Sequence, residues 1–203
     1  MTYTPIARSP MERQAAAAGA RFEVREGWNV AVTYPGPRPK TAWADVSHLP
    51  KHFRDGPHDL ELGRAVGKDG AWWCPVSDRR AVVIGGESEP EFGFNSGFGG
   101  TGFARAGGTG FTSLGFAGLT VLGPQARELI ARFCAIDLRP RSAPPSSFRP
   151  GSIARQPGMI LCEGEDRYML LFGWAIAQYM WTVVEDAGSH LGARPIGIDQ
   201  LDA

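Results

Sequence analysis

Residues 119–133 read LTVLGPQARELIARF and pass from a short apolar run into a helix-forming stretch. The run 119–122 has the length and composition of a strand. Pro124 stands where a helix would begin, because proline is favoured at the first helical position. Apolar residues then recur at i, i+3, i+4 and i+7, which predicts one apolar helix face made of Ala126, Leu129, Ile130 and Phe133.

The chain after this stretch continues in the same alternation of elements. Residues 159–162 and 168–172 are apolar runs separated by the acidic turn 163–166, which is typical of a β-hairpin. A second helix is predicted for 175–187, and a last short strand for 195–198. The apolar face of that helix comprises Ile176, Tyr179, Met180 and Val183. Strand, helix, strand, strand, helix, strand is the βαββαβ order of a ferredoxin-like unit in an α+β fold.

The first part of the chain shows the same kinds of element less regularly. An alanine-rich stretch, 11–20, predicts a helix, and the alternating stretches 21–26 and 29–34 predict two half-buried strands. The run AVVI at 81–84 predicts a buried strand. We therefore expect a rougher copy of the same unit here, and two ferredoxin-like subdomains in all.

Residues 85–118 separate the two predicted subdomains, 1–84 and 119–203, and are dominated by glycine and phenylalanine. So much glycine carries a large backbone entropy cost, which favours a long loop. The phenylalanines argue against a solvated linker, because such linkers are rich in polar residues. The alternative is a loop that docks on a partner through its rings, for which the candidates are Phe98, Phe103, Phe111 and Phe116.

Composition narrows the class of protein. The 203 residues hold 21 Lys plus Arg and 21 Asp plus Glu, so zero net charge gives no electrostatic case for binding nucleic acid or a membrane surface. Cys74, Cys134 and Cys162 are far apart and odd in number, which indicates reduced thiols rather than disulfides. We see neither a signal peptide nor a run long enough to span a bilayer, and we expect a cytoplasmic protein.

Several stretches resemble, in order, the folate-binding aminomethyltransferases of glycine cleavage. The family's patterns "aGakf" and "GW.mPv.Y" are similar to residues 18–34, and its "DvSHlgk" to DVSHLPK at 45–51. Three more patterns, "vqGPkA", "yTGEdGfE" and "Gv.PaGl", are similar to residues 122–126, 163–168 and 192–197. A narrower resemblance covers GPQARELIARFCAIDLRP, Ile153-Ala154-Arg155, GEDRYMLLF and AQYMW. These look like the gamma subunit of heterotetrameric sarcosine oxidase.

The departures from the transferase pattern bear on chemistry. The family's Asp-rich segment, which positions the folate amine, corresponds to residues 73–83, where Asp78 is the only acid. Arg79 and Arg80 crowd Asp78, which suits a salt bridge better than proton transfer. The transferase also continues into a C-terminal barrel, whereas this chain stops at Ala203.

The resemblance therefore implies a non-catalytic, gamma-type subunit of a folate-linked complex that demethylates N-methyl amines. Flavin is implied on partner catalytic flavoprotein subunits, and no cofactor is expected to bind tightly here. Tetrahydrofolate is the one cofactor left open, with Glu165 and Tyr168 as candidate pterin ligands, because a carboxylate can pair with the pterin N–H groups. A transferase acting directly and a folate-binding regulatory module remain the alternatives.

Other sequence patterns give weaker indications. His48 and His52 have a spacing that suits metal ligands on a helix, but Pro50 breaks any helix there, and we expect no metal site. The GxGxxG match at 97–102 neither follows a strand nor opens a helix, which excludes a dinucleotide fingerprint. Trp72 and Trp73 are more typical of a core or an interface than of a ligand platform.

Overall fold

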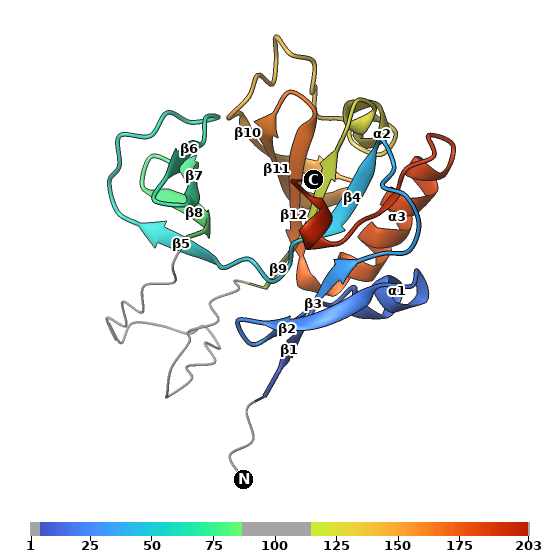
Figure 1. The fold of residues 1–203 in the computed structure, drawn as a ribbon. Coiled ribbons are helices and arrows are strands. Elements are labelled where there is room, and N and C mark those ends of the chain that lie inside the picture. The colour runs from blue at the N-terminus through green and yellow to red at the C-terminus, as the bar shows by residue number, and fades with distance from the viewer. Residues whose placement is uncertain (1–4, 87–114, 203) are drawn as a thin grey trace.

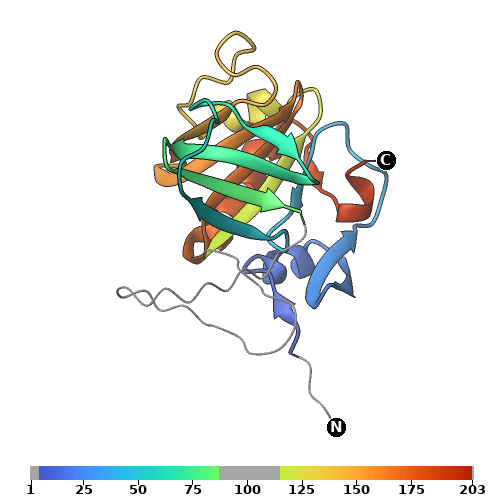
Figure 2. The same ribbon diagram turned by 90° about the vertical axis from the view of Figure 1, so that its left-hand side faces the viewer.

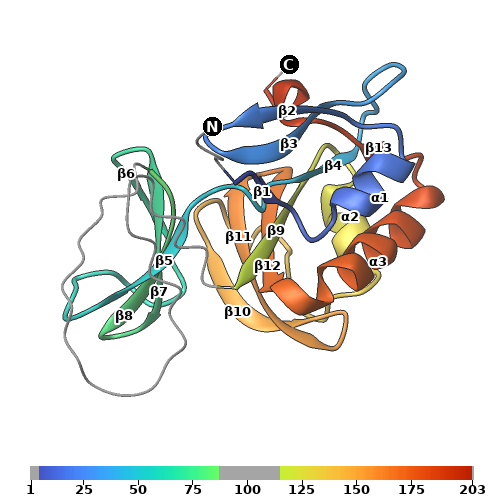
Figure 3. The same ribbon diagram turned by 90° about the horizontal axis from the view of Figure 1, so that it is seen from below.

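A computed structural model of the chain describes residues 5–86 and 115–202 and has three layers (Figure 3). A six-stranded sheet lies in the middle, two helices cover one of its faces, and a four-stranded sheet covers the other. The predicted α+β class is confirmed. The six-stranded sheet has the order β10-β11-β12-β9-β4-β13. Its strands are β4 (Ala42–Asp45), β9 (Phe116–Leu122), β10 (Phe148–Ile153), β11 (Gln156–Gly164), β12 (Arg167–Gly173) and β13 (Arg194–Pro195).

The central strands read as continuous apolar runs because both faces of this sheet are covered. Successive side chains of a strand point to opposite faces. In β12, Tyr168, Leu170 and Phe172 belong to the core on the helix side, and Met169 and Leu171 to the core between the sheets. The strands at 119–122, 159–162 and 168–172 were predicted for this reason.

The finer prediction of two ferredoxin-like subdomains is not confirmed. A ferredoxin-like unit would place the last strand, β13, directly beside β9. Instead β4, from the first part of the chain, lies antiparallel to β9 and parallel to β13. One sheet thus combines strands from residues 1–84 and 119–203, and the division of the chain into those units stays a prediction.

Helices α2 (Ala126–Ala131) and α3 (Ala177–Ser189), the latter preceded by the 3-10 turn η1 (Trp174–Ile176), lie on the same face of the sheet. The predicted face of α2 is buried except for its last member, Phe133, which is half-buried. The face of α3 is displaced from the prediction, because the buried residues are Ala177, Met180, Trp181, Val184 and Gly188. Tyr179 stands 49% exposed.

The four-stranded sheet has the order β5-β8-β7-β6 and is antiparallel throughout (Figure 2). Its strands are β5 (Lys51–Asp55), β6 (Val66–Lys68), β7 (Ala71–Ser77) and β8 (Arg80–Gly85). Only β8 was expected. The inner face contributes Cys74, Val82 and Ile84 to the core that the two sheets share.

A small third sheet lies at one end of the molecule, next to α1 (Glu12–Ala17), as Figure 1 shows. It comprises β1 (Ala7–Arg8), β2 (Arg21–Arg25) and β3 (Trp28–Thr33), in the order β1-β3-β2. The C-terminal turn η2 (Ile198–Gln200) packs against β3. At Gly197 the approach is so close that a Cβ would lie 2.0 Å from the Val32 carbonyl.

Three of the four phenylalanines proposed for docking, Phe98, Phe103 and Phe111, lie outside the described residues. Phe116 belongs to β9 rather than to a loop, and its ring meets Phe53 edge-on at a centroid distance of 6.3 Å. In residues 5–86 and 115–202, no helix has the length and apolar character needed to cross a membrane.

Candidate functional site

The two candidate folate ligands lie at the β11–β12 hairpin. Tyr168 is 1% exposed, and its hydroxyl donates to the Glu165 carbonyl at 2.9 Å. Arg127 Nε donates to the same hydroxyl at 3.2 Å, and burial raises the pKa of Tyr168. The Glu165 side chain is exposed at the turn. The structure therefore joins Tyr168 to the backbone of Glu165 and does not place the hydroxyl and the carboxylate in one cavity.

Asp78, the one acid in the stretch that matches the Asp-rich segment, lies exposed in the β7–β8 turn. Arg79 and Arg80 were expected to hold Asp78 in a salt bridge, but among the described residues Asp78 makes none. Arg80 Nε pairs instead with Asp55 Oδ1 at 2.5 Å on the neighbouring strand. Hydrogen bonding to Arg80 lowers the pKa of Asp55. These contacts brace the outer end of the four-stranded sheet.

A buried polar cluster occupies the turn from β4 to β5, within the stretch DVSHLPK. Asp45 accepts hydrogen bonds from Ser9 Oγ and, at 2.9 Å, from the Ser47 backbone N–H. Burial raises the pKa of Asp45. Ser47 is fully buried, and its hydroxyl accepts from the Gly118 N–H of β9 at 3.2 Å. The Asp45 carboxylate and the Ser47 hydroxyl therefore both take part in hydrogen bonds that hold the fold together.

Lys51 is the cation of this cluster and is 0% exposed. Its Nζ donates to the carbonyls of Val46, Ser47 and Leu49 at 3.3, 3.1 and 2.8 Å. Burial lowers the pKa of Lys51 to about 8, against the attraction of Asp45. Since an ammonium group has three N–H bonds, its donors are all used, and the residue ties together the turn that links the two sheets.

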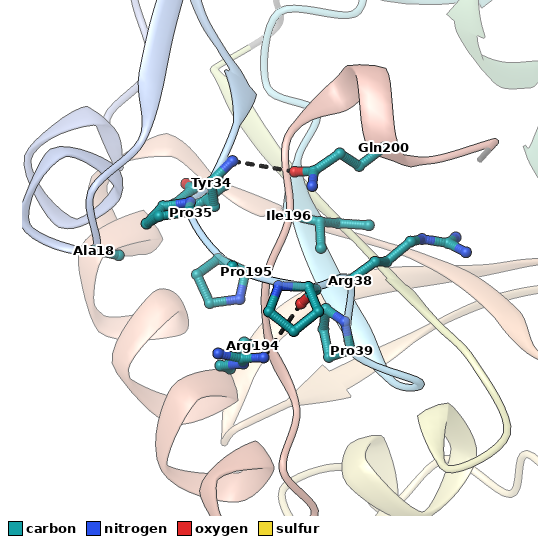
Figure 4. A pocket seen from close by; sticks show the side chains of 11 residues that line it. Ala18, Tyr34, Pro35, Arg38, Pro39, Arg194, Pro195, Ile196 and Gln200 are labelled. Atoms are coloured by element: carbon teal, nitrogen blue, oxygen red, sulfur yellow. Dashed lines mark hydrogen bonds between the residues drawn. The ribbon is translucent and has the colours of Figure 1, made fainter.

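A pocket of about 180 Å³ is lined in part by Tyr34 (Figure 4). Burial, with a smaller effect of the Asp45 charge, raises the pKa of Tyr34. Figure 4 shows the proline-rich loop of residues 35–39 facing the C-terminal segment across this pocket. The lining residues are Ala18, Tyr34, Pro35, Gly36, Pro37, Arg38, Pro39, Arg194, Pro195, Ile196 and Gln200.

The charged groups of this pocket are two guanidinium groups. Arg194 donates to the Pro37 carbonyl at 3.2 Å, and Arg38 donates to the Leu201 carbonyl at 3.4 Å. No carboxylate lines the pocket. Drug-sized ligands occupy cavities of roughly 300–1,000 Å³, so this pocket suits a small anion or one side chain rather than a folate.

Sequence reasoning missed the buried cluster that contains Asp45 and Lys51, although both residues lie in a stretch quoted for its resemblance. The available signal was an aspartate and a lysine six residues apart in the stretch DVSHLPK. His48 in the same turn has its pKa lowered to about 4 by burial, with Lys51 and Arg25 adding to the effect. Across residues 5–86 and 115–202, we find no group of three or more His, Cys, Asp or Glu side chains that could hold a metal ion.

Comparison with known proteins confirms the fold. No family model and no curated protein matches the sequence. The structure is similar to a chain of heterotetrameric sarcosine oxidase from Corynebacterium sp. U-96 in complex with pyrrole 2-carboxylate. The TM-score is 0.65 at 18% identity, over 92% of this chain and 96% of that chain.

A second similar structure is glycine cleavage system aminomethyltransferase T from Bartonella henselae. The TM-score is 0.68 at 15% identity, over 96% of this chain but 60% of that one. The predicted likeness to aminomethyltransferases thus holds for the fold.

Proposed function

We propose that this chain is a non-catalytic subunit of a hetero-oligomeric flavoenzyme that oxidises N-methyl amines. The observation that carries the proposal is the extent of one structural match. It covers 96% of a chain from heterotetrameric sarcosine oxidase and 92% of this chain, so the two chains correspond almost end to end. In this proposal the flavin and the reacting amine lie on partner subunits.

The state of the carboxylates supports a structural role. Direct one-carbon transfer needs an acid that can reach the amine of the folate. Asp45 is half-buried with its oxygens hydrogen-bonded to Ser9 and Ser47, while Asp78 and Glu165 are exposed in hairpin turns. None of the three lies in the pocket beside Tyr34.

In this proposal the chain binds no folate through Glu165 and Tyr168. Tyr168 has its hydroxyl hydrogen-bonded to Glu165 and Arg127, and its ring belongs to the main core. A pterin that used this hydroxyl would have to displace both partners. We therefore assign no folate step to this chain.

A direct transferase is the second candidate, and the TM-score of 0.68 to an aminomethyltransferase favours it. The chain spans 60% of that structure, so the comparison includes only part of the enzyme's framework. A tetrahydrofolate-binding regulatory module would use the same fold without the chemistry.

The proposal is tested by activity measurements on the isolated chain and on the assembly purified with it. We expect sarcosine-dependent reduction of a flavin in the assembly, and no aminomethyl transfer by the isolated chain with tetrahydrofolate. Asp45→Asn and Glu165→Gln should leave the specific activity of a correctly assembled complex unchanged. Turnover by the isolated chain that either substitution abolishes would establish the transferase instead.

A further inference from the structure

The two helices that cover the six-stranded sheet leave some of their apolar side chains outside the core. The predicted face of α2 ends at Phe133, which is half-buried, while Ala126, Leu129 and Ile130 are fully buried. In α3 the buried face leaves Tyr179 49% exposed. Each helix therefore has apolar surface beyond what the sheet covers.

These surplus side chains line one open groove of about 550 Å³, which we call the α2–α3 groove. The β10–β11 turn forms its third wall. The lining residues are Ala131, Arg132, Phe133, Cys134, Ala135, Ala154, Arg155, Tyr179 and Val183. Its lining combines a phenylalanine and a tyrosine with two arginines, which are residue types enriched at protein interfaces.

The β10–β11 turn holds a strained conformation over this groove. Ile153 pairs with Gln156, so Ala154 and Arg155 form a two-residue hairpin turn with φ of +49° and +63°. Such turns favour Asn or Gly, because a side chain is disfavoured at positive φ. Two contacts hold the turn in place: the Ala154 N–H donates to the Phe133 carbonyl at 2.9 Å, and Tyr179 Oη donates to the Ala154 carbonyl at 3.3 Å.

The charge of the groove is positive. No Asp or Glu lines it, whereas Arg132 and Arg155 do. Arg132 is engaged with Glu128 at 3.1 Å and with the Ala187 carbonyl at 3.2 Å. Among the described residues, Arg155 makes no ion pair, and it is exposed. An arginine without an ion pair, on a strained turn beside the Phe133 and Tyr179 side chains, is complementary to a carboxylate that a partner would supply.

We infer that the α2–α3 groove docks a short acidic segment of a partner subunit, with a carboxylate on Arg155 and an apolar side chain against Phe133 and Tyr179. This inference rests on the proposed function, since it assigns the surface through which a subunit would join its complex. Tyr179 adds a large, rigid ring that can pack on the segment while its hydroxyl stays bonded to the turn.

Photo-crosslinking in the assembled complex tests where the partner lies. Tyr179 is replaced by the photoreactive residue benzoylphenylalanine, and the adduct is identified by mass spectrometry. We expect a partner peptide that contains Asp or Glu next to an apolar residue. A complex that assembles but gives no adduct at this position, or an adduct without an acid, would overturn the docking site alone.

The charge is tested by Arg155→Gln, with Arg79→Gln as the matched control at the exposed β7–β8 turn. The dissociation constant of the purified assembly is measured by mass photometry. We expect Arg155→Gln to raise it about tenfold or more, as the loss of a charge-assisted hydrogen bond does, and the control to leave it unchanged. Equal effects of the two substitutions would refute the role of Arg155. A wild-type chain that purifies without partners would overturn the proposed function and the docking site together.

Discussion

Lys51 shows how a single charged side chain can be buried without leaving a hydrogen bond unmade. Its three donors reach three carbonyls of one turn, and Asp45 lies close enough to favour its charge. A buried group of this kind fixes the geometry of the chain where β4 leaves one sheet and β5 enters the other. The stretch DVSHLPK thus has a structural explanation that does not require chemistry on a substrate.

His48 in this turn makes the stability of the protein depend on pH. Its pKa is lowered from the ordinary 6.5 to about 4, so the folded state binds fewer protons than the unfolded state between these values. Stability is therefore greatest above pH 6.5 and falls as the pH drops towards 4, by an amount on the order of 3 kcal/mol for full protonation. We predict that His48→Gln flattens this part of the profile, as measured by urea unfolding from pH 4 to 7.

The same exchange at exposed His190 controls for the loss of a histidine elsewhere on the surface. If the profiles of the wild type and His48→Gln stay parallel over this range, His48 is not the group that responds.

Tyr168 provides a second prediction at this scale. Its hydroxyl lies between the Glu165 carbonyl and the Arg127 guanidinium, so Tyr168→Phe removes both hydrogen bonds and leaves the ring in place. We expect a loss of about 1 kcal/mol in the free energy of unfolding. The urea midpoint would fall accordingly. Unchanged stability would mean that the hydroxyl is free to serve a ligand.

At the scale of elements, the sequence predicted those strands and helices whose burial shows as a periodic pattern of apolar residues. The apolar runs of β9, β11 and β12 and the apolar face of α2 were predicted correctly, because burial on a strand or a helix leaves a periodic trace. The existence of α3 was predicted too, but its buried face is displaced from the predicted one. The four-stranded sheet was largely missed, since β5 and β6 contain mostly polar or exposed residues. The insertion of β4 between β9 and β13 is a long-range pairing that no local pattern records.

The site was less predictable than the fold for a related reason. Glu165 and Tyr168 are three positions apart, and both carry groups that could bind a pterin. In the hairpin, however, Glu165 is exposed and Tyr168 lies in the core. The pocket beside Tyr34 combines residues 18, 34–39 and 194–200, whose proximity depends on the pairing of β4 with β13.

At Gly123, directly after β9, the backbone passes close to the segment that enters β4. Its φ is +106°, and a Cβ would lie 2.0 Å from the Lys40 carbonyl oxygen and 2.8 Å from the Thr41 Cα. We predict that Gly123→Ala destabilises the fold by about 3 kcal/mol or more, because backbone must move at both segments. Gly164→Ala is the control, since nothing lies within 4 Å of its added Cβ. Similar unfolding midpoints for the two variants would contradict this account of the β9–β4 contact.

In the β10–β11 turn, by contrast, we expect a substitution that does not destabilise the fold. Arg155 has a φ of +63°, and glycine adopts this conformation without the steric cost that a side chain carries. Arg155→Gly should therefore leave the free energy of unfolding unchanged or raise it by up to about 1 kcal/mol, while it weakens assembly. A clear fall in thermal stability would show that Arg155 supports the fold rather than the partner.

At the scale of the whole molecule, the six-stranded sheet lies between the two helices on one face and the four-stranded sheet on the other. The β4–β5 turn connects the two large sheets, and β4 itself brings the first part of the chain into the sheet formed by the last. This arrangement uses Asp45, Ser47 and Lys51 to hold the turn between the sheets. Phe133 and Tyr179 remain partly exposed in the α2–α3 groove. Such a molecule is suited to support partners that carry the chemistry.

The native mass of the tagged chain, isolated from the organism that produces it, tests this account most directly. The account predicts a hetero-oligomer of fixed stoichiometry whose other chains carry flavin and oxidise an N-methyl amine. A monomer of this chain that binds tetrahydrofolate and transfers a one-carbon group by itself would contradict it.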